Sequence, residues 1–136
     1  MGSPLMILID SNIPMYLIGK EHPLKSRAIR LCHELVLQEE RLVTDVEVFQ
    51  EILHRYAAIH RRDAIQPCFD ALLGIVDQVL PIELSDIQKA KELLLGYRKL
   101  SARDAIHAAI MQKHEIAQVL TFDAGFDLLP GLTRIH

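Results

Sequence analysis

Short, strongly apolar runs alternate along this chain with stretches of helical periodicity. The first run is LMILI at 5–9, and further runs lie at 41–44, 78–83, 117–122 and 132–135. Such runs predict strands, and the amphipathic stretches between them predict helices. This alternation is typical of a parallel sheet covered by helices on both faces. We therefore expect one α/β domain over residues 1–136, a three-layer α/β/α sandwich with a central, mostly parallel sheet of four or five strands.

The expected helices carry apolar residues at three- and four-residue spacing, and most begin at a capping residue or a proline. Two of their boundaries depend on specific residues. Thr44-Asp45-Val46-Glu47 matches a capping box with Thr44 as the cap, and Ser85 is expected to cap a later helix. Pro81 cannot donate to a neighbouring strand, so the run at 78–83 is expected at a sheet edge. The first expected helix is short and is capped by Asn12. The others cover residues 23–40, 46–59, 63–76, 85–96 and 101–114.

Composition narrows the classes of function. Fifteen Lys and Arg stand against eighteen Asp and Glu, and the net charge of -3 gives no basic footprint for nucleic acid. A divalent cation bound among carboxylates would neutralise part of this negative charge, so the net charge does not exclude an RNA substrate. The chain has no Trp, three Tyr and four Phe, which makes base stacking on an aromatic platform a weak route to function. Cys32 and Cys68 stand in apolar contexts, which indicates two reduced, buried thiols.

The ends and the hydropathy of the chain bear on its location. No apolar run approaches the ~20 residues of a membrane span, and the N-terminus lacks the basic start of a signal peptide. We therefore expect a cytoplasmic protein that has no membrane partner. Residues 1–4 are expected to be a cloning remnant ahead of a native start at Met6.

Acidic residues gather where the strands are expected to end. Asp10 follows the first strand and Asp123 the run at 117–122, so both leave the same sheet edge if these strands are parallel neighbours. Asp104 lies in the first turn of its helix, Glu51 lies two turns into another, and Asp127 follows Asp123 by one turn. Clustered carboxylates raise one another's pKa unless a cation joins them, and oxygen ligands suit Mg²⁺ or Mn²⁺. The pattern predicts metal-assisted hydrolysis of a phosphodiester.

Each of these acidic residues also has an ordinary structural interpretation. Asp10 and Asp123 can cap the turns that follow them, and Asp104 completes an S-x-x-D capping pattern with Ser101. Glu51 falls away from the apolar stripe of its helix, so periodicity alone predicts a solvated surface residue. The residues indicate a site only through the sheet edge that they are expected to share.

Four segments in order carry a resemblance to a known family: LIDSN, EVFQEIL, LSARDAIHAAI and VLTFDAGFD. They resemble the PIN-domain family, and most closely its VapC-type toxin ribonucleases from prokaryotic toxin–antitoxin pairs. The resemblance covers the chain from Met6 to the last strand and implies an α/β/α sandwich with Mg²⁺- or Mn²⁺-dependent endoribonuclease activity. It places the catalytic and metal-binding quartet on Asp10, Glu51, Asp104 and Asp123. It also implies a homodimer and a small cognate antitoxin that covers the active site.

Several neighbours of the quartet have roles that the resemblance suggests. Asp127 matches an acidic position of some members and would help through water. Asn12 and Thr121 match polar positions that orient the aspartates or contact phosphate, although capping and strand-end roles suit them equally. His107 follows Asp104 by three residues, and we expect it to be a structural hydrogen-bonding residue outside the catalytic set.

Basic residues near these segments are candidates for holding RNA phosphates, a role that positions the substrate without reading its sequence. Any one of them can equally be a solvated surface charge. The candidates are Arg55, Arg61 and Arg62 after the helix of Glu51, and Arg98, Lys99 and Arg103 close to Asp104. A third patch comprises Lys20, Lys25, Arg27 and Arg30.

Two other functions stay open at this level. A receiver-like signalling domain has a similar length and the same alternation of strands and helices. Such a domain usually carries paired acidic residues after its first strand and a lysine late in the chain, near its pocket. Here Ser11 follows Asp10, and the last confident strand ends in Thr121-Phe122-Asp123 without a lysine. A catalytically silent PIN-like module that binds RNA or protein is the other alternative, and the intact quartet argues against it.

Overall fold

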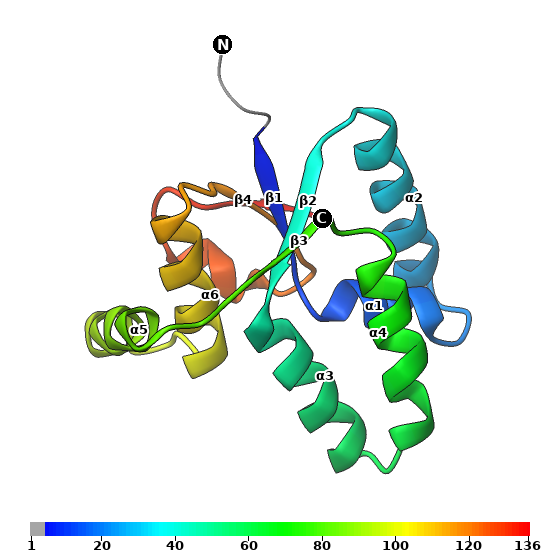
Figure 1. Cartoon of the computed structure of the whole chain (residues 1–136), viewed down its shortest axis with the longest axis horizontal. Coiled ribbons are helices and arrows are strands. Elements are labelled where there is room, and N and C mark those ends of the chain that lie inside the picture. Colours follow the sequence, from blue (N-terminus) through cyan, green and yellow to red (C-terminus); the bar gives the residue numbers. More distant parts are fainter. Residues whose placement is uncertain (1–4) are drawn as a thin grey trace.

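A five-stranded, fully parallel sheet forms the centre of the computed structural model, which describes residues 5–136 (Figure 1). The strand order is β3-β2-β1-β4-β5, and every neighbouring pair is parallel. The expected cloning remnant at residues 1–4 lies outside the described residues. The strands are β1 (Met6–Ile9), β2 (Arg41–Asp45), β3 (Gln78–Leu80), β4 (Gln118–Leu120) and β5 (Thr133–Ile135).

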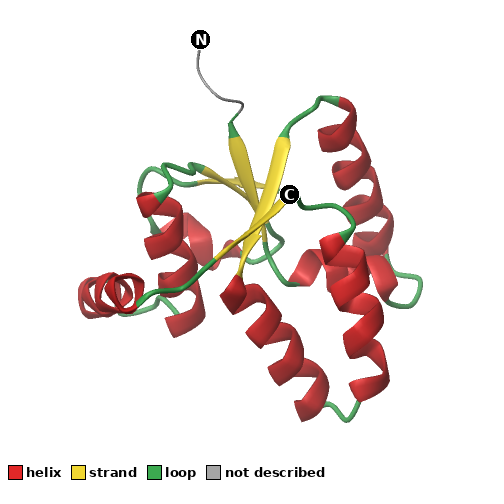
Figure 2. Ribbon diagram, viewed as in Figure 1, coloured by secondary structure: helices red, strands yellow, loops and turns green. Residues whose placement is uncertain are grey.

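Helices cover both faces of this sheet, so the expected three-layer α/β/α sandwich is confirmed (Figure 2). On one face Ile7 and Ile9 of β1 pack in a core shared with α1–α4, while Leu8 faces a second core with α6. Helix α5 packs along α6. The helices are α1 (Asn12–Ile18), α2 (Pro23–Leu37), α3 (Val46–Ala58), α4 (Ile65–Leu73), α5 (Leu84–Gly96) and α6 (Ala102–Lys113), with short 3₁₀ helices at Arg62–Ala64 and Ala124–Leu128.

Strand β1 is the central strand because its residues are apolar on both faces. Ile7, Leu8 and Ile9 are almost completely buried, as expected for a strand covered by helices on both sides. The chain then turns at Asp10, whose N–H donates to the Leu120 carbonyl at 3.1 Å. The ends of β1 and β4 are thereby held side by side.

Two predicted helix starts are wrong by one or two residues. Strand β2 continues through Asp45, which pairs with Leu80, so Asp45 rather than Thr44 caps α3 and accepts from Val48 N–H at 3.1 Å. The Thr44 hydroxyl donates instead to the Ile9 carbonyl. Helix α5 begins after Glu83 rather than Ser85.

Other boundaries follow from local chemistry. The expected edge strand is found at β3, and it ends before Pro81, which has no N–H to continue the ladder. The helix expected at 63–76 is shorter, because it begins as a 3₁₀ turn and ends at Leu73. Cys32 and Cys68 are buried and unpaired, as expected. No helix within residues 5–136 has the length and apolar character needed to span a bilayer.

Candidate active site

An open cleft of about 900 Å³ lies beyond the carboxyl ends of β1, β2 and β4. This is the position at which open parallel sheets place their ligand sites. Asp10, Glu51 and Asp123 line the cleft, and Asp104 is buried beside Arg103, which lines it too. The fold therefore brings the four expected acidic residues to one edge of the sheet.

Asp10 is held in place by hydrogen bonds to both carboxylate oxygens. Ser11 N–H donates to Oδ1 at 2.7 Å, and the Thr121 hydroxyl donates to Oδ2 at 2.7 Å. The residue is only 3 % exposed. Burial raises the pKa of Asp10 above its ordinary value, and nearby Glu51 adds to the rise, although the charge of His107 opposes it. A carboxylate in this position gains from a cation nearby.

Asn12 and Thr121 connect the end of β1 to the end of β4. The Asn12 amide donates to Thr121 Oγ1 at 3.0 Å, and its oxygen accepts from Phe122 N–H at 3.2 Å. Thr121 Oγ1 also accepts from Asp123 N–H at 3.0 Å. Both residues therefore lie in the hydrogen-bond network around Asp10 and Asp123, a position compatible with either an orienting or a strand-end role.

Asp104 and Asp123 approach each other around Gly125. An ideal Cβ on Gly125 would lie 2.9 Å from Asp104 Oδ2 and 3.1 Å from Asp123 Oδ1, so both carboxylates crowd this backbone. Burial, followed by the charges of Asp123 and Asp10, raises the pKa of Asp104 to about 7. The Ser101 hydroxyl accepts from Asp104 N–H at 3.2 Å, so the predicted cap at Ser101 is also present.

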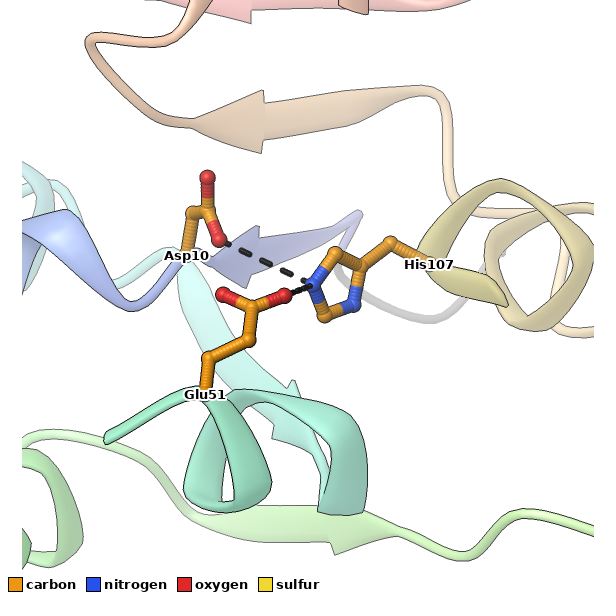
Figure 3. Close-up of side chains that lie close together, drawn as sticks. All are labelled: Asp10, Glu51 and His107. Carbon is orange, nitrogen blue, oxygen red and sulfur yellow. Dashed lines mark hydrogen bonds and ion pairs between the residues drawn. The ribbon is translucent and has the colours of Figure 1, made fainter. Parts of the chain in front are cut away.

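Glu51 is buried at 7 % exposure, so the surface position that periodicity predicted for it is wrong. Its Oε2 accepts from the Ser11 hydroxyl at 2.5 Å, and its Oε1 lies 2.7 Å from His107 Nε2. Figure 3 shows Asp10, Glu51 and His107 converging from three separate elements. Glu51 therefore faces the acidic centre with both oxygens engaged.

His107 is fully buried among carboxylates. Its Nδ1 lies 2.6 Å from Asp45 Oδ2, and its Nε2 lies 2.7 Å from Glu51 and 3.7 Å from Asp10. Burial alone would lower its pKa, but the Asp45 charge and the hydrogen bonds to Asp45 and Glu51 outweigh burial and raise the pKa well above its ordinary value. His107 thus supplies positive charge to an acidic cluster.

Three residues of this site, His107, Asp45 and Gly125, were hard to recognise from local sequence patterns. The i, i+3 spacing from Asp104 placed His107 on the same side of α6, but its two carboxylate partners lie more than 50 positions away. Asp45 was predicted only as a member of the capping box in which Thr44 was the expected cap. Gly125 had no local signal at all.

The expected phosphate-binding residues divide into two groups. Arg55 and Arg103 line the cleft and are exposed. The other four, Arg61, Arg62, Arg98 and Lys99, are exposed but do not line it. Arg61 forms an ion pair with Asp63, and Arg98 and Lys99 border a small hollow beside Leu128.

Asp127 and the third basic patch also lie outside the lining of the cleft. The Asp127 side chain is 57 % exposed and pairs with Arg134 at 3.2 Å. In the patch, Lys25 donates to the Gly19 carbonyl and Arg27 to the terminal His136 carbonyl. The geometry therefore gives no support to a helper role for Asp127.

The donor set suits a divalent cation. Within residues 5–136, no Lys or Arg lies at ion-pair distance from Asp10, Asp104 or Asp123. Oxygen and nitrogen atoms of Asp10, Glu51 and His107 lie within 4.8 Å of one another. Each nitrogen of His107 is directed at a carboxylate, however, so the oxygens are the better donors for a hard cation such as Mg²⁺.

Comparison with known proteins agrees with this fold. The PIN domain family model matches residues 7–132. Ribonuclease VapC13 of Mycobacterium tuberculosis is 58% identical over 130 residues, which cover 96% of this chain and 99% of that protein. The chain therefore belongs to the PIN-domain family, and its VapC ribonucleases are the relatives that it matches over nearly its full length.

Solved structures show the same fold at much lower identity. The crystal structure of the Mycobacterium tuberculosis toxin VapC20, described as cleaving the sarcin–ricin loop, has a TM-score of 0.73 at 22% identity and covers 89% of this chain and 92% of its own. A chain of the VapBC2 structure from Rickettsia felis, bound to a promoter DNA fragment, has a TM-score of 0.74 at 16% identity and covers 96% and 98%.

Proposed function

We propose that this protein is a metal-dependent endoribonuclease and the toxin of a VapC-type toxin–antitoxin pair. The observation that carries the proposal is the meeting of Asp10, Asp104 and Asp123 beside an open cleft, with no Lys or Arg of residues 5–136 at ion-pair distance from them. The name of the VapC13 relative supports the same activity. The PIN-domain membership leaves the receiver-like alternative without support.

Asp10, Glu51, Asp104 and Asp123 would hold Mg²⁺, or Mn²⁺ in its place. When bound, this ion would lower the pKa of a water molecule and offset charge on the phosphodiester under attack. Thr121 and Ser11 hold the Asp10 carboxylate through hydrogen bonds of 2.7 Å, so this carboxylate is oriented before substrate arrives. Such prior order lowers the cost of assembling the reactive geometry.

Water is the nucleophile that fits this cleft. The Ser11 hydroxyl donates to Glu51 and the Thr121 hydroxyl donates to Asp10, so both hydroxyls orient carboxylates that would hold the ion. Water adds to phosphorus as the ester bond to the sugar oxygen breaks, and the proton that water loses ends on that departing oxygen. Arg55 and Arg103 are exposed along the cleft and would hold the flanking phosphates.

The partners belong to the same proposal. We expect a small cognate antitoxin that covers the cleft, a homodimer, and a cytoplasmic location. Antitoxin binding is supported by the likeness to the VapBC2 structure from Rickettsia felis, which is bound to a DNA fragment from the promoter of that pair. If a small open reading frame lies next to this gene, co-expression with its product, followed by light scattering, tests the complex and the dimer together.

RNA cleavage tests the activity directly. The wild-type protein should cut RNA with Mg²⁺ and stop with EDTA, and Asp10→Asn should lower the rate at least about a hundredfold, as expected when a residue holding the reactive centre is lost. Asp70→Asn is a matched control, because Asp70 is an exposed residue of α4 outside the cleft. Cleavage that survives both EDTA and Asp10→Asn would reject this mechanism.

The catalytically silent module is the remaining alternative. Calorimetric titration with Mn²⁺ separates it from the nuclease. The acidic centre should bind Mn²⁺, and Asp104→Asn should weaken that binding because it removes a carboxylate from the cluster. Wild-type protein without measurable Mn²⁺ binding and without cleavage would favour the silent module.

A further inference from the structure

We propose that His107 is a positioning residue that, supported by Asp45, fixes the Glu51 carboxylate in the acidic centre. The inference rests on the proposed nuclease function, and it assigns a role to two buried residues outside the acidic quartet. It starts from the contacts of Glu51, which lies on α3, while His107 lies on α6.

The Glu51 carboxylate is held at both of its oxygens. Oε1 lies 2.7 Å from His107 Nε2, and Oε2 accepts from the Ser11 hydroxyl at 2.5 Å. A glutamate side chain has three rotatable bonds, so a single bond would leave its carboxylate free to rotate. Two hydrogen bonds, one to each oxygen, define the plane of the carboxylate. Hydrogen-bond partners behind metal-binding side chains commonly orient them in this way.

His107 is itself held from the far side. Its Nδ1 lies 2.6 Å from Asp45 Oδ2, and its ring stacks on Phe126 at a centroid distance of 6.1 Å. The other oxygen of Asp45 caps α3, the helix that carries Glu51. Asp45 therefore fixes both the helix that presents Glu51 and the imidazole that contacts the end of its side chain.

Neither His107 nor Asp45 can touch RNA, because both have 0 % exposure. Asp10 is the only other ionisable group of the described residues at ion-pair distance from His107, at 3.7 Å. That separation is too long for a hydrogen bond. His107 therefore acts on the acidic centre through its hydrogen bond to Glu51, and its charge also acts on Asp10.

Two substitutions of His107 separate this role from mere support of the fold. The amide nitrogen of glutamine occupies roughly the place of Nε2, so His107→Gln can keep the bond to Glu51 and loses Asp45. The amide nitrogen of asparagine occupies roughly the place of Nδ1, so His107→Asn can keep Asp45 and loses Glu51. Each variant leaves one buried carboxylate oxygen without a partner, so their losses of stability should be similar.

The pair should differ in catalysis and in metal binding. His107→Asn should lower kcat for RNA cleavage and the calorimetric affinity for Mn²⁺ by about 10- to 100-fold, while KM for RNA stays unchanged. His107→Gln should stay closer to the wild type in both measurements. His33→Gln is the control, because His33 is exposed on α2 and does not line the cleft.

The outcomes separate the two levels of the proposal. Wild-type protein that neither binds Mn²⁺ nor cuts RNA would reject the nuclease function itself. If the wild type is active and the two folded variants are equally impaired, or both unimpaired, the positioning role is wrong.

A measurement on the wild type covers the case in which neither variant folds. The side-chain ¹⁵N signal of His107 Nε2 should shift when Mg²⁺ saturates the protein, because its hydrogen-bond partner is then engaged by the ion. An unchanged signal at saturation would also overturn the positioning role.

Discussion

The carboxylate of Asp45 lies 2.6 Å from Nδ1 of His107, and neither side chain is exposed to solvent. Asp45 ends β2, whereas His107 lies in the middle of α6, so the contact joins the sheet to the helix that also carries Asp104. Burying such a pair is costly for each partner alone, because an unpaired charge in the interior has lost its hydration. The pair therefore couples the stability of the fold to the geometry of the acidic centre.

Asp45→Ala should be strongly destabilising. It removes the cap of α3 and leaves His107 with no partner at Nδ1, and breaking a buried pair in this way costs about 3–5 kcal/mol. Urea unfolding followed by circular dichroism gives the free energy of unfolding. Asp70→Ala, at an exposed position, should stay within about 0.5 kcal/mol of the wild type. A loss below about 1 kcal/mol for Asp45→Ala would show that the pair contributes little.

Gly125→Ala should damage metal binding more than folding. The added Cβ would lie 2.9 Å from Asp104 and 3.1 Å from Asp123, so both carboxylates have to move. We expect Mn²⁺ affinity to fall about 10-fold or more, as for other changes that disturb ligand orientation. Gly96→Ala is the matched control, because nothing lies within 4 Å of its added Cβ. Equal Mn²⁺ affinities for the two variants would contradict the crowding at Gly125.

Asp104 should make the metal-free protein less stable as the pH rises. Burial, with the charges of Asp123 and Asp10, raises its pKa from 3.8 to about 7. Between these values the folded state binds more protons than the unfolded state, so the free energy of unfolding falls as the pH rises.

Asp104→Asn removes this dependence, because the amide resembles the protonated acid. In EDTA at pH 8 the variant should be more stable than the wild type by on the order of 1–2 kcal/mol, a value reduced by solvent screening. Thermal unfolding at pH 5 and pH 8 measures the difference, which should shrink at pH 5. Saturating Mg²⁺ should reverse the order at pH 8, and a difference independent of pH would contradict the raised pKa.

The strands, the central place of β1 and the edge place of β3 were open to prediction because they depend on local patterns. Ile7, Leu8 and Ile9 are apolar on both faces of one strand, which is sufficient to predict a buried central position. Pro81 likewise marked an edge strand. Neither inference needed knowledge of a distant partner.

The helix caps and Glu51 were harder because distant residues decide them. Strand β2 continues to Asp45 because that residue pairs with Leu80 of β3, which moves the cap by one position. Glu51 is buried because His107, 56 positions later, supplies a hydrogen bond inside the protein. Helical periodicity measures apolarity and has no means of detecting a buried polar partner.

Arg103 should contribute to RNA binding without contributing to the chemical step. Arg103 is exposed and lines the cleft, and it directly precedes Asp104 in the sequence. Within residues 5–136, its guanidinium forms no ion pair. Arg103→Ala should raise KM for RNA several-fold and lower the salt dependence of binding by about one unit of slope, as expected for loss of one phosphate contact. Arg41→Ala is the control, because Arg41 lies at the amino-terminal end of β2, away from the cleft at the carboxyl ends of the strands, and pairs with Asp77. RNA titrations at several salt concentrations measure both slopes. If Arg103→Ala and Arg41→Ala both keep the wild-type salt dependence and KM, Arg103 does not contact the RNA phosphates.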